Sequence, residues 1–177
     1  MMNEDIITKV ENFAKKYYKH DQTLWKDHIR LVREYAIKLA KIEKCDALVI
    51  EIASILHDIG KYDGRDGHAE RSYELSKEFL KRLELSEKQK KLILKCILKH
   101  GSKHAVEDNE IEVKVIQCAD ALGTIFDDDW QEYSRKTVDK QTLLGLFDKT
   151  YKKINLKSAK KIAKPKVEKL RKIVLSM

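Results

Sequence analysis

The sequence predicts an all-α fold, and three features carry this prediction. The 177 residues include only one proline and six glycines, so residues that break helices are scarce. Apolar residues recur at helical spacing along most of the chain. No segment of useful length alternates apolar and polar residues, the pattern that marks a half-buried strand. We therefore expect one domain over residues 1–177, a bundle of about six to eight helices without a sheet.

Each expected helix is a segment whose apolar residues return every three or four positions. In the second of them, His28 lies one turn before Val32 and shares its apolar face. In the sixth, Ile116 and Asp120 are one turn apart. The expected helices cover about residues 3–19, 24–42, 46–57, 68–83, 86–100, 111–126, 140–153 and 156–175.

Capping residues and glycines set several of these boundaries. Asp46 is a typical N-cap for the third helix, and Gly60 is a natural stop after it. Ser86 followed by Gln89 resembles a capping box that opens the fifth helix, and Gly101 ends that helix. Segments 61–67 and 101–109 are expected to be loops, 127–139 is a charged stretch without a clear assignment, and Pro165 should kink the last helix.

Composition limits the function classes. A net charge of +8 favours anionic ligands such as phosphate esters. Much of the excess lies between Lys149 and Lys172, which we interpret as a solvated helix face, so nucleic acid is not an expected partner. The sequence contains no run of about 18 apolar residues, so a membrane span is not expected. The acidic start of the chain lacks a signal-peptide core. A cytoplasmic location is the expectation.

The three cysteines, Cys45, Cys96 and Cys118, are far apart and show no CxxC spacing. Disulfides and a structural zinc site are therefore not expected. Cys96 and Cys118 lie in apolar stretches and are predicted to be buried thiols that pack as small hydrophobic side chains.

Histidines and aspartates mark the candidate site. His57-Asp58 ends an apolar run, with His28 upstream and Asp120 on a later apolar segment. These four come from three expected helices, which can direct them at one centre inside a bundle. Imidazole and carboxylate ligands together suit divalent metals, namely Mn, Fe, Co, Ni or Zn, and Mg stays open. A lone histidine on an apolar face is more often a core residue, but the set of four favours metal ligation.

This pattern resembles the HD superfamily of metal-dependent phosphohydrolases. The matching residues are His28, His57-Asp58 and Asp120, in the contexts HIRLVREYAIKLA, ASILHDIGKY, LKCILKHG and VIQCADAL, and the ending LKSAKKIAKPKVEKLRKI is similar too. The resemblance implies an all-helical fold, a divalent metal held by these four residues, and hydrolysis of a phosphate ester or anhydride. A nucleotide or other small phosphorylated metabolite is the expected substrate.

His68 and His100 lie between the His-Asp pair and Asp120. Superfamily members with two metals carry additional histidines there, so the resemblance leaves one ion and two ions both open; in a two-ion site Asp58 would bridge the ions and a bridging hydroxide would attack phosphorus. The alternative is a pair of helix-terminal histidines, which explains His100 well and His68 poorly.

Three further side chains are candidates for roles beside the metal. Lys61 follows the His-Asp pair and is predicted to act in catalysis and to hold a substrate phosphate. Arg71 is a candidate substrate-binding residue, and Glu70 beside it could assist a water molecule. His20 and His104 lie in polar surroundings and are expected to face solvent.

Several alternatives stay open at this point. A di-iron oxygenase on the same fold fits the same six residues, and a nucleotide-sensing module without turnover would not need them. The sequence does not choose between one and two ions, among the metals, or among cyclic diester, monoester and pyrophosphate substrates. It also leaves the oligomeric state open, a homodimer included.

Overall fold

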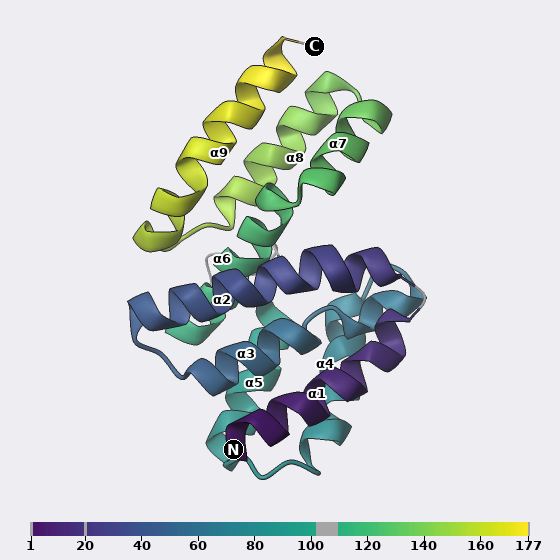
Figure 1. Cartoon of the computed structure of the whole chain (residues 1–177), viewed down its shortest axis with the longest axis vertical. Helices are drawn as coiled ribbons and strands as arrows, with labels where there is room; N and C mark the ends of the chain where they lie inside the picture. The colour runs from purple at the N-terminus through teal and green to yellow at the C-terminus, as the bar shows by residue number, and fades with distance from the viewer. Residues whose placement is uncertain (1, 20, 102–109, 177) are drawn as a thin grey trace.

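The protein is all-α, as the sequence predicts. A computed structural model describes residues 2–19, 21–101 and 110–176, and within these ranges it contains nine α-helices, two short helical segments and no strand. Helices α1 to α5 form one part of the molecule, and α7 to α9 stand together on the other side of α6 (Figure 1). The two ends of the chain therefore lie far apart.

The bounds of the helical segments follow the order of the chain. In order they are α1 Met2–Tyr18, the π-helix η1 Leu24–Ile29, α2 Arg30–Glu43, α3 Ala47–Leu56, the 3-10 helix η2 Ile59–Asp63, α4 His68–Leu80, α5 Glu87–Lys99, α6 Ile111–Phe126, α7 Asp128–Thr137, α8 Lys140–Lys152 and α9 Lys157–Leu175.

Polar caps explain where several helices begin. The Asp46 carboxylate accepts hydrogen bonds from the backbone N–H groups of Leu48 and Val49, so it caps α3 as predicted. Ser86 and Gln89 form the predicted capping box at the start of α5. The Asp127 and Asp139 side chains likewise cap α7 and α8. The charged stretch 127–139, to which the sequence assigns no structure, therefore contains helix α7.

Helix α6 is the centre of the fold. It packs against α2, α3 and α5 on one side and against α7, α8 and α9 on the other (Figure 1). It is buried over most of its circumference, as expected for a helix surrounded by others. Asp120 lies in the middle of this helix, so its side chain is held inside the protein rather than on a flexible surface.

Two details of the predicted helices are wrong. The predicted helix over residues 24–42 begins with the π-turns of η1 before α2 continues as a regular helix. Gly60 does not stop α3, which ends at Leu56; it lies inside η2 and has no positive φ. A Cβ at Gly60 would lie 2.4 Å from the His68 carbonyl oxygen and 2.7 Å from the Ser72 nitrogen. The glycine is therefore required by the close approach of η2 to α4, rather than by a special backbone conformation.

Other expectations have mixed outcomes. All three cysteines are free, and Cys96 and Cys118 are buried as predicted. Pro165 lies within α9, which continues through it. None of the described helices has both the length and the apolar character that a membrane span requires. His20, His104 and almost all of the predicted 101–109 loop lie outside the described residues.

Candidate metal centre

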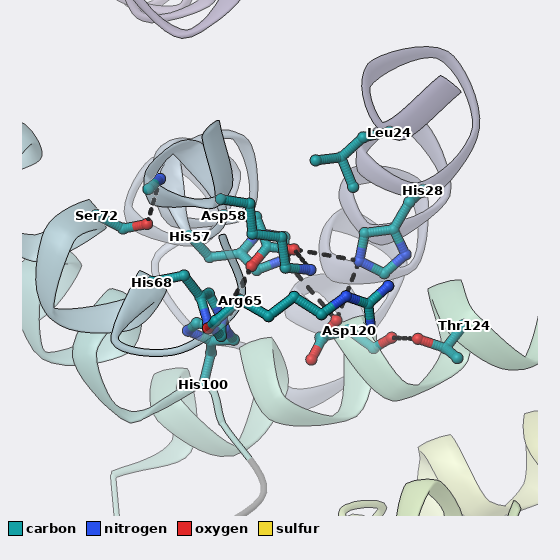
Figure 2. A network of polar contacts seen from close by, with 12 residues as sticks. Leu24, His28, His57, Asp58, Arg65, His68, Ser72, His100, Asp120 and Thr124 are labelled. Carbon is teal, nitrogen blue, oxygen red and sulfur yellow. Dashed lines mark hydrogen bonds and ion pairs between the residues drawn. The ribbon is translucent and has the colours of Figure 1, made fainter. Parts of the chain in front are cut away.

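Four of the predicted ligands converge from separate parts of the chain. His28 comes from η1, His57 and Asp58 from the end of α3, and Asp120 from α6, and their side chains turn toward one another (Figure 2). His57 Nε2 lies 3.2 Å from Asp58 Oδ2, and His28 Nε2 lies 3.6 Å from the same oxygen. Asp120 Oδ1 lies 3.2 Å from His28 Nε2. One imidazole or carboxylate atom from each residue can thus face a single point.

Asp58 also belongs to a second group, with His68 and His100. Its other oxygen, Oδ1, lies 3.2 Å from His68 Nε2 and 3.5 Å from His100 Nε2. The two oxygens of one buried carboxylate therefore face two different sets of histidines (Figure 2). One carboxylate thus takes part in both groups of candidate ligands.

Three of the four histidines are oriented by their own backbone. Nδ1 of His57 lies 2.8 Å from the Ser54 carbonyl, and Nδ1 of His68 and of His100 lies 2.6 Å from a carbonyl three residues earlier. Because a carbonyl oxygen can only accept, each Nδ1 must carry the hydrogen. The lone pair is then on Nε2, the atom that faces Asp58. Metal-binding histidines are held in this way by a partner on the other ring nitrogen.

Three of the atoms that face the centre have no hydrogen-bond partner. His28 Nε2, His57 Nε2 and Asp58 Oδ1 are buried without a hydrogen bond. His68 Nε2 and His100 Nε2 are 3.0 Å apart, although both are lone-pair atoms in the tautomers their carbonyl partners require. Neighbouring nitrogens at right angles on one ion, each about 2.1 Å from it, would be separated by about 3 Å. The residues present therefore fit a divalent metal.

Two lysines balance the carboxylates. The Lys61 ammonium pairs with Asp58 Oδ2, and the Lys153 ammonium pairs with Asp120 Oδ2. Burial raises the pKa of Asp58, but His57 and Lys61 outweigh it and hold this pKa well below its usual value. Burial likewise opposes the charge of Asp120, and Lys153 contributes most to keeping its pKa well below the usual range. Both carboxylates are thus ionised, as metal ligands must be.

Local structure explains how these side chains reach the centre. Asp58 leaves the helical conformation, with φ −112° and ψ 7°, so it no longer diverges from His57 as it would along a regular helix. On the other side, a Cβ at Gly123 of α6 would lie 2.6 Å from Val32 Cγ2 and 3.5 Å from His28 Cε1. The bare glycine lets α2 and η1 approach α6 closely enough to bring His28 to Asp120.

A cavity of about 780 Å³ opens onto the centre. His28, His68, His100 and Asp120 line its inner part together with Lys61. Sequence analysis missed five other residues that line it, because they lie in a loop, in a charged stretch and in a lysine-rich stretch that look like ordinary surface. These residues are Arg65, Trp130, Tyr133, Lys149 and Lys153.

The remaining predicted site residues have different surroundings. Lys61 contacts Asp58 directly, and Glu70 lines the cavity. The Arg71 guanidinium donates hydrogen bonds to the carbonyl oxygens of Gly60, Gly64 and Asp66, so it holds the loop around η2 in place. Substrate binding by Arg71 stays a prediction, and these three bonds favour a positioning role instead.

The sequence matches a known protein family over the segment that holds this site. The family model of the HD domain matches residues 25–125, more than half of the chain, and the match contains all six candidate ligands. The chain belongs to the HD-domain family. No curated protein gives a significant sequence match.

Two solved structures share the fold of this HD domain. An HD-superfamily hydrolase from Bacillus thuringiensis superposes with a TM-score of 0.74 at 20% identity, covering 98% of this chain and 95% of the other. Bacillus subtilis YpgQ, in complex with ADP, superposes with a TM-score of 0.72 at 17% identity, covering 99% and 95%. Both likenesses extend beyond the matched segment, so α7 to α9 are part of the shared fold.

Metal binding should be visible in the stability of this HD domain. Adding Mn²⁺ or Co²⁺ to metal-stripped protein at about a hundred times Kd is expected to raise the free energy of unfolding by about 2.7 kcal/mol, because the folded state alone offers the converged ligands. Thermal unfolding with and without the ion measures this. The shift should shrink strongly in His28→Ala, and an equal shift in both proteins would place the ion elsewhere.

Proposed function

We propose that this protein is a metal-dependent phosphohydrolase that cleaves a phosphate ester or anhydride of a nucleotide or other small phosphorylated metabolite. The observation that carries this proposal is the position of Asp58, whose two oxygens face two sets of oriented histidine nitrogens. Such a site suits two divalent ions, with His28, His57, Asp58 and Asp120 on one and Asp58, His68 and His100 on the other.

Bound ions would supply an acidic water as nucleophile and would polarise the phosphoryl oxygens. The protein contributes the rest. His57, His68 and His100 keep their Nε2 lone pairs directed at the centre through their bonds to backbone carbonyls. Lys61 adds a positive charge at the edge of the centre, where it can stabilise negative charge that develops on the phosphoryl group.

A nucleotide is the favoured substrate class within this proposal. The cavity is of the size that holds a small-molecule ligand, and it carries both cationic side chains and the aromatic rings of Trp130 and Tyr133. YpgQ, which shares the fold, was solved with ADP bound. The family match and the hydrolase among the similar structures support a hydrolytic reaction.

The test is release of phosphate or p-nitrophenol from a panel of phosphate esters and nucleotides. Metal-stripped protein is assayed with Mn²⁺, Co²⁺, Ni²⁺, Mg²⁺ or Fe(II) added back. We expect release that depends on the metal and is lost in His57→Ala and Asp120→Ala, because each variant removes a ligand. Asp148→Ala is the control, since Asp148 pairs with Arg171 on the exposed surface and does not line the cavity.

The opposite result also has a definite meaning. If no metal supports release although the protein binds metal at these residues, the phosphohydrolase proposal fails. Oxygen uptake that depends on Fe(II) would then indicate a di-iron oxygenase on the same fold, and nucleotide binding without turnover would indicate a sensor.

A further inference from the structure

The cavity beside the metal centre is larger than one phosphoryl group needs. Its volume of about 780 Å³ lies well within the range of pockets that hold whole cofactors or drug-sized ligands. It extends from the histidines to the facing side of α8, which contributes Lys149 and Lys153. The chemistry of α8 therefore bears on what lies beyond the reacting phosphoryl group.

Lys153 connects α8 to the metal centre. It is the C-cap of α8, where the partial negative charge of the helix end favours a cation. Its side chain is only 11% exposed, and its ammonium contacts Asp120 Oδ2, while Asp120 Oδ1 faces His28. The ammonium thus stands directly beside a candidate metal ligand, on the side away from the histidines.

Lys149 lies one helical turn before Lys153 and lines the same cavity. Among the described residues, no carboxylate lies within ion-pairing distance of its ammonium. Two like charges four residues apart on a helix repel each other and destabilise it slightly. An anion bound between them would remove this cost, and the face of α8 that they share points into the cavity.

The other walls of the cavity are less suitable for an anion. Asp27 of η1, Asp66 of the loop before α4 and Asp129 of α7 all line it. Arg65 also lines it, from the exposed loop before α4, and its side chain extends toward the metal centre rather than toward α8 (Figure 2). A chain of phosphoryl groups that begins at the metal centre would therefore extend along α8, past Lys153 toward Lys149.

We propose that Lys149 and Lys153 form a second phosphate subsite, so that the substrate carries at least two adjacent phosphoryl groups and the bond cleaved is a phosphoanhydride or lies next to one. This inference rests on the proposed function, because the first phosphoryl group is the one held at the metal centre. It selects nucleoside diphosphates and triphosphates over monophosphates.

Binding of two small anions tests this subsite without any turnover. Affinities of the Mn²⁺-loaded protein for methylenediphosphonate, a diphosphate analogue that cannot be hydrolysed, and for inorganic phosphate are measured by calorimetry. The wild type should bind the diphosphonate at least about tenfold more tightly than phosphate, since each charge-assisted hydrogen bond adds appreciable affinity. Lys149→Gln should lower diphosphonate affinity about tenfold and leave phosphate affinity unchanged.

Lys152→Gln is the matched control, because it removes the same charge from the same helix at a position that does not line the cavity. It should bind both anions as the wild type does, and Lys149→Arg should restore diphosphonate binding. Equal affinities of the wild type for the two anions would overturn the subsite, and so would equal losses in Lys149→Gln and Lys152→Gln. Tight diphosphonate binding in a protein that hydrolyses nothing would leave the subsite standing and remove only the proposed hydrolysis.

Discussion

Replacing Asp58 by asparagine is expected to abolish metal binding at both of the proposed sites. Asp58 is the one residue shared by the two groups of candidate ligands, and each of its oxygens faces a different group. Asparagine keeps the shape but loses the charge and one ligand oxygen. We expect metal affinity and phosphate release to fall by more than about a hundredfold, since even the outer partners of metal ligands are worth about 10–100-fold.

The number of ions bound shows whether Asp58 is a ligand shared by two ions or a ligand of one ion. Calorimetry with Mn²⁺ should show two ions for the wild type, one for His100→Ala and none for Asp58→Asn. His100→Ala is the matched comparison, because His100 belongs only to the group with His68. Far-ultraviolet circular dichroism checks that each variant is folded. A single ion bound by both the wild type and His100→Ala would contradict a two-metal site with Asp58 as its bridge.

Replacing Gly60 by alanine is expected to destabilise the fold and to displace His68. The new Cβ would meet the His68 carbonyl oxygen, the Ser72 nitrogen and the Arg71 Cβ at 2.4 to 2.8 Å. Two of these are backbone atoms, so the start of α4 must move as a unit. Overpacking of this kind costs roughly 1–3 kcal/mol. Urea denaturation of the metal-free protein measures the loss, and Mn²⁺ binding reports whether the site with His68 survives.

Gly145→Ala provides the matched control for this substitution. Gly145 lies within α8, and a Cβ added there would meet nothing within 4 Å. Alanine is the better helix former by about 0.8–1.0 kcal/mol, so this variant should be more stable than the wild type. Unfolding of Gly60→Ala at the same urea concentration as the wild type would contradict the close packing of η2 against α4.

Much of the fold could be predicted because local signals and apolar periodicity agree. Asp46 and the Ser86–Gln89 pair cap helices where the sequence predicts them, and α6 has its predicted bounds. The charged segment that forms α7 could not be assigned from the sequence, because the two residues that it buries, Gln131 and Ser134, are polar and add nothing to an apolar periodicity. Its cap, Asp127, is one of three consecutive aspartates, any of which could have served.

The candidate site was predictable in its members and not in its arrangement. The sequence named His28, His57, Asp58 and Asp120, with His68 and His100 as additions, because these residue types lie at the ends or on the apolar faces of expected helices. Nothing in the sequence distinguished Lys153 from its many neighbouring lysines. Only the packing of α8 against α6 brings its ammonium to Asp120.

The sequence by itself determined the all-α fold, most helix boundaries and the six residues that could hold metal, because periodicity, capping and residue chemistry are local properties. The tertiary structure decided which oxygen of Asp58 faces which histidines, why position 60 must be glycine, and which lysines line the cavity. These depend on distances between helices that are remote in sequence, and such distances are set by the packing of the whole core.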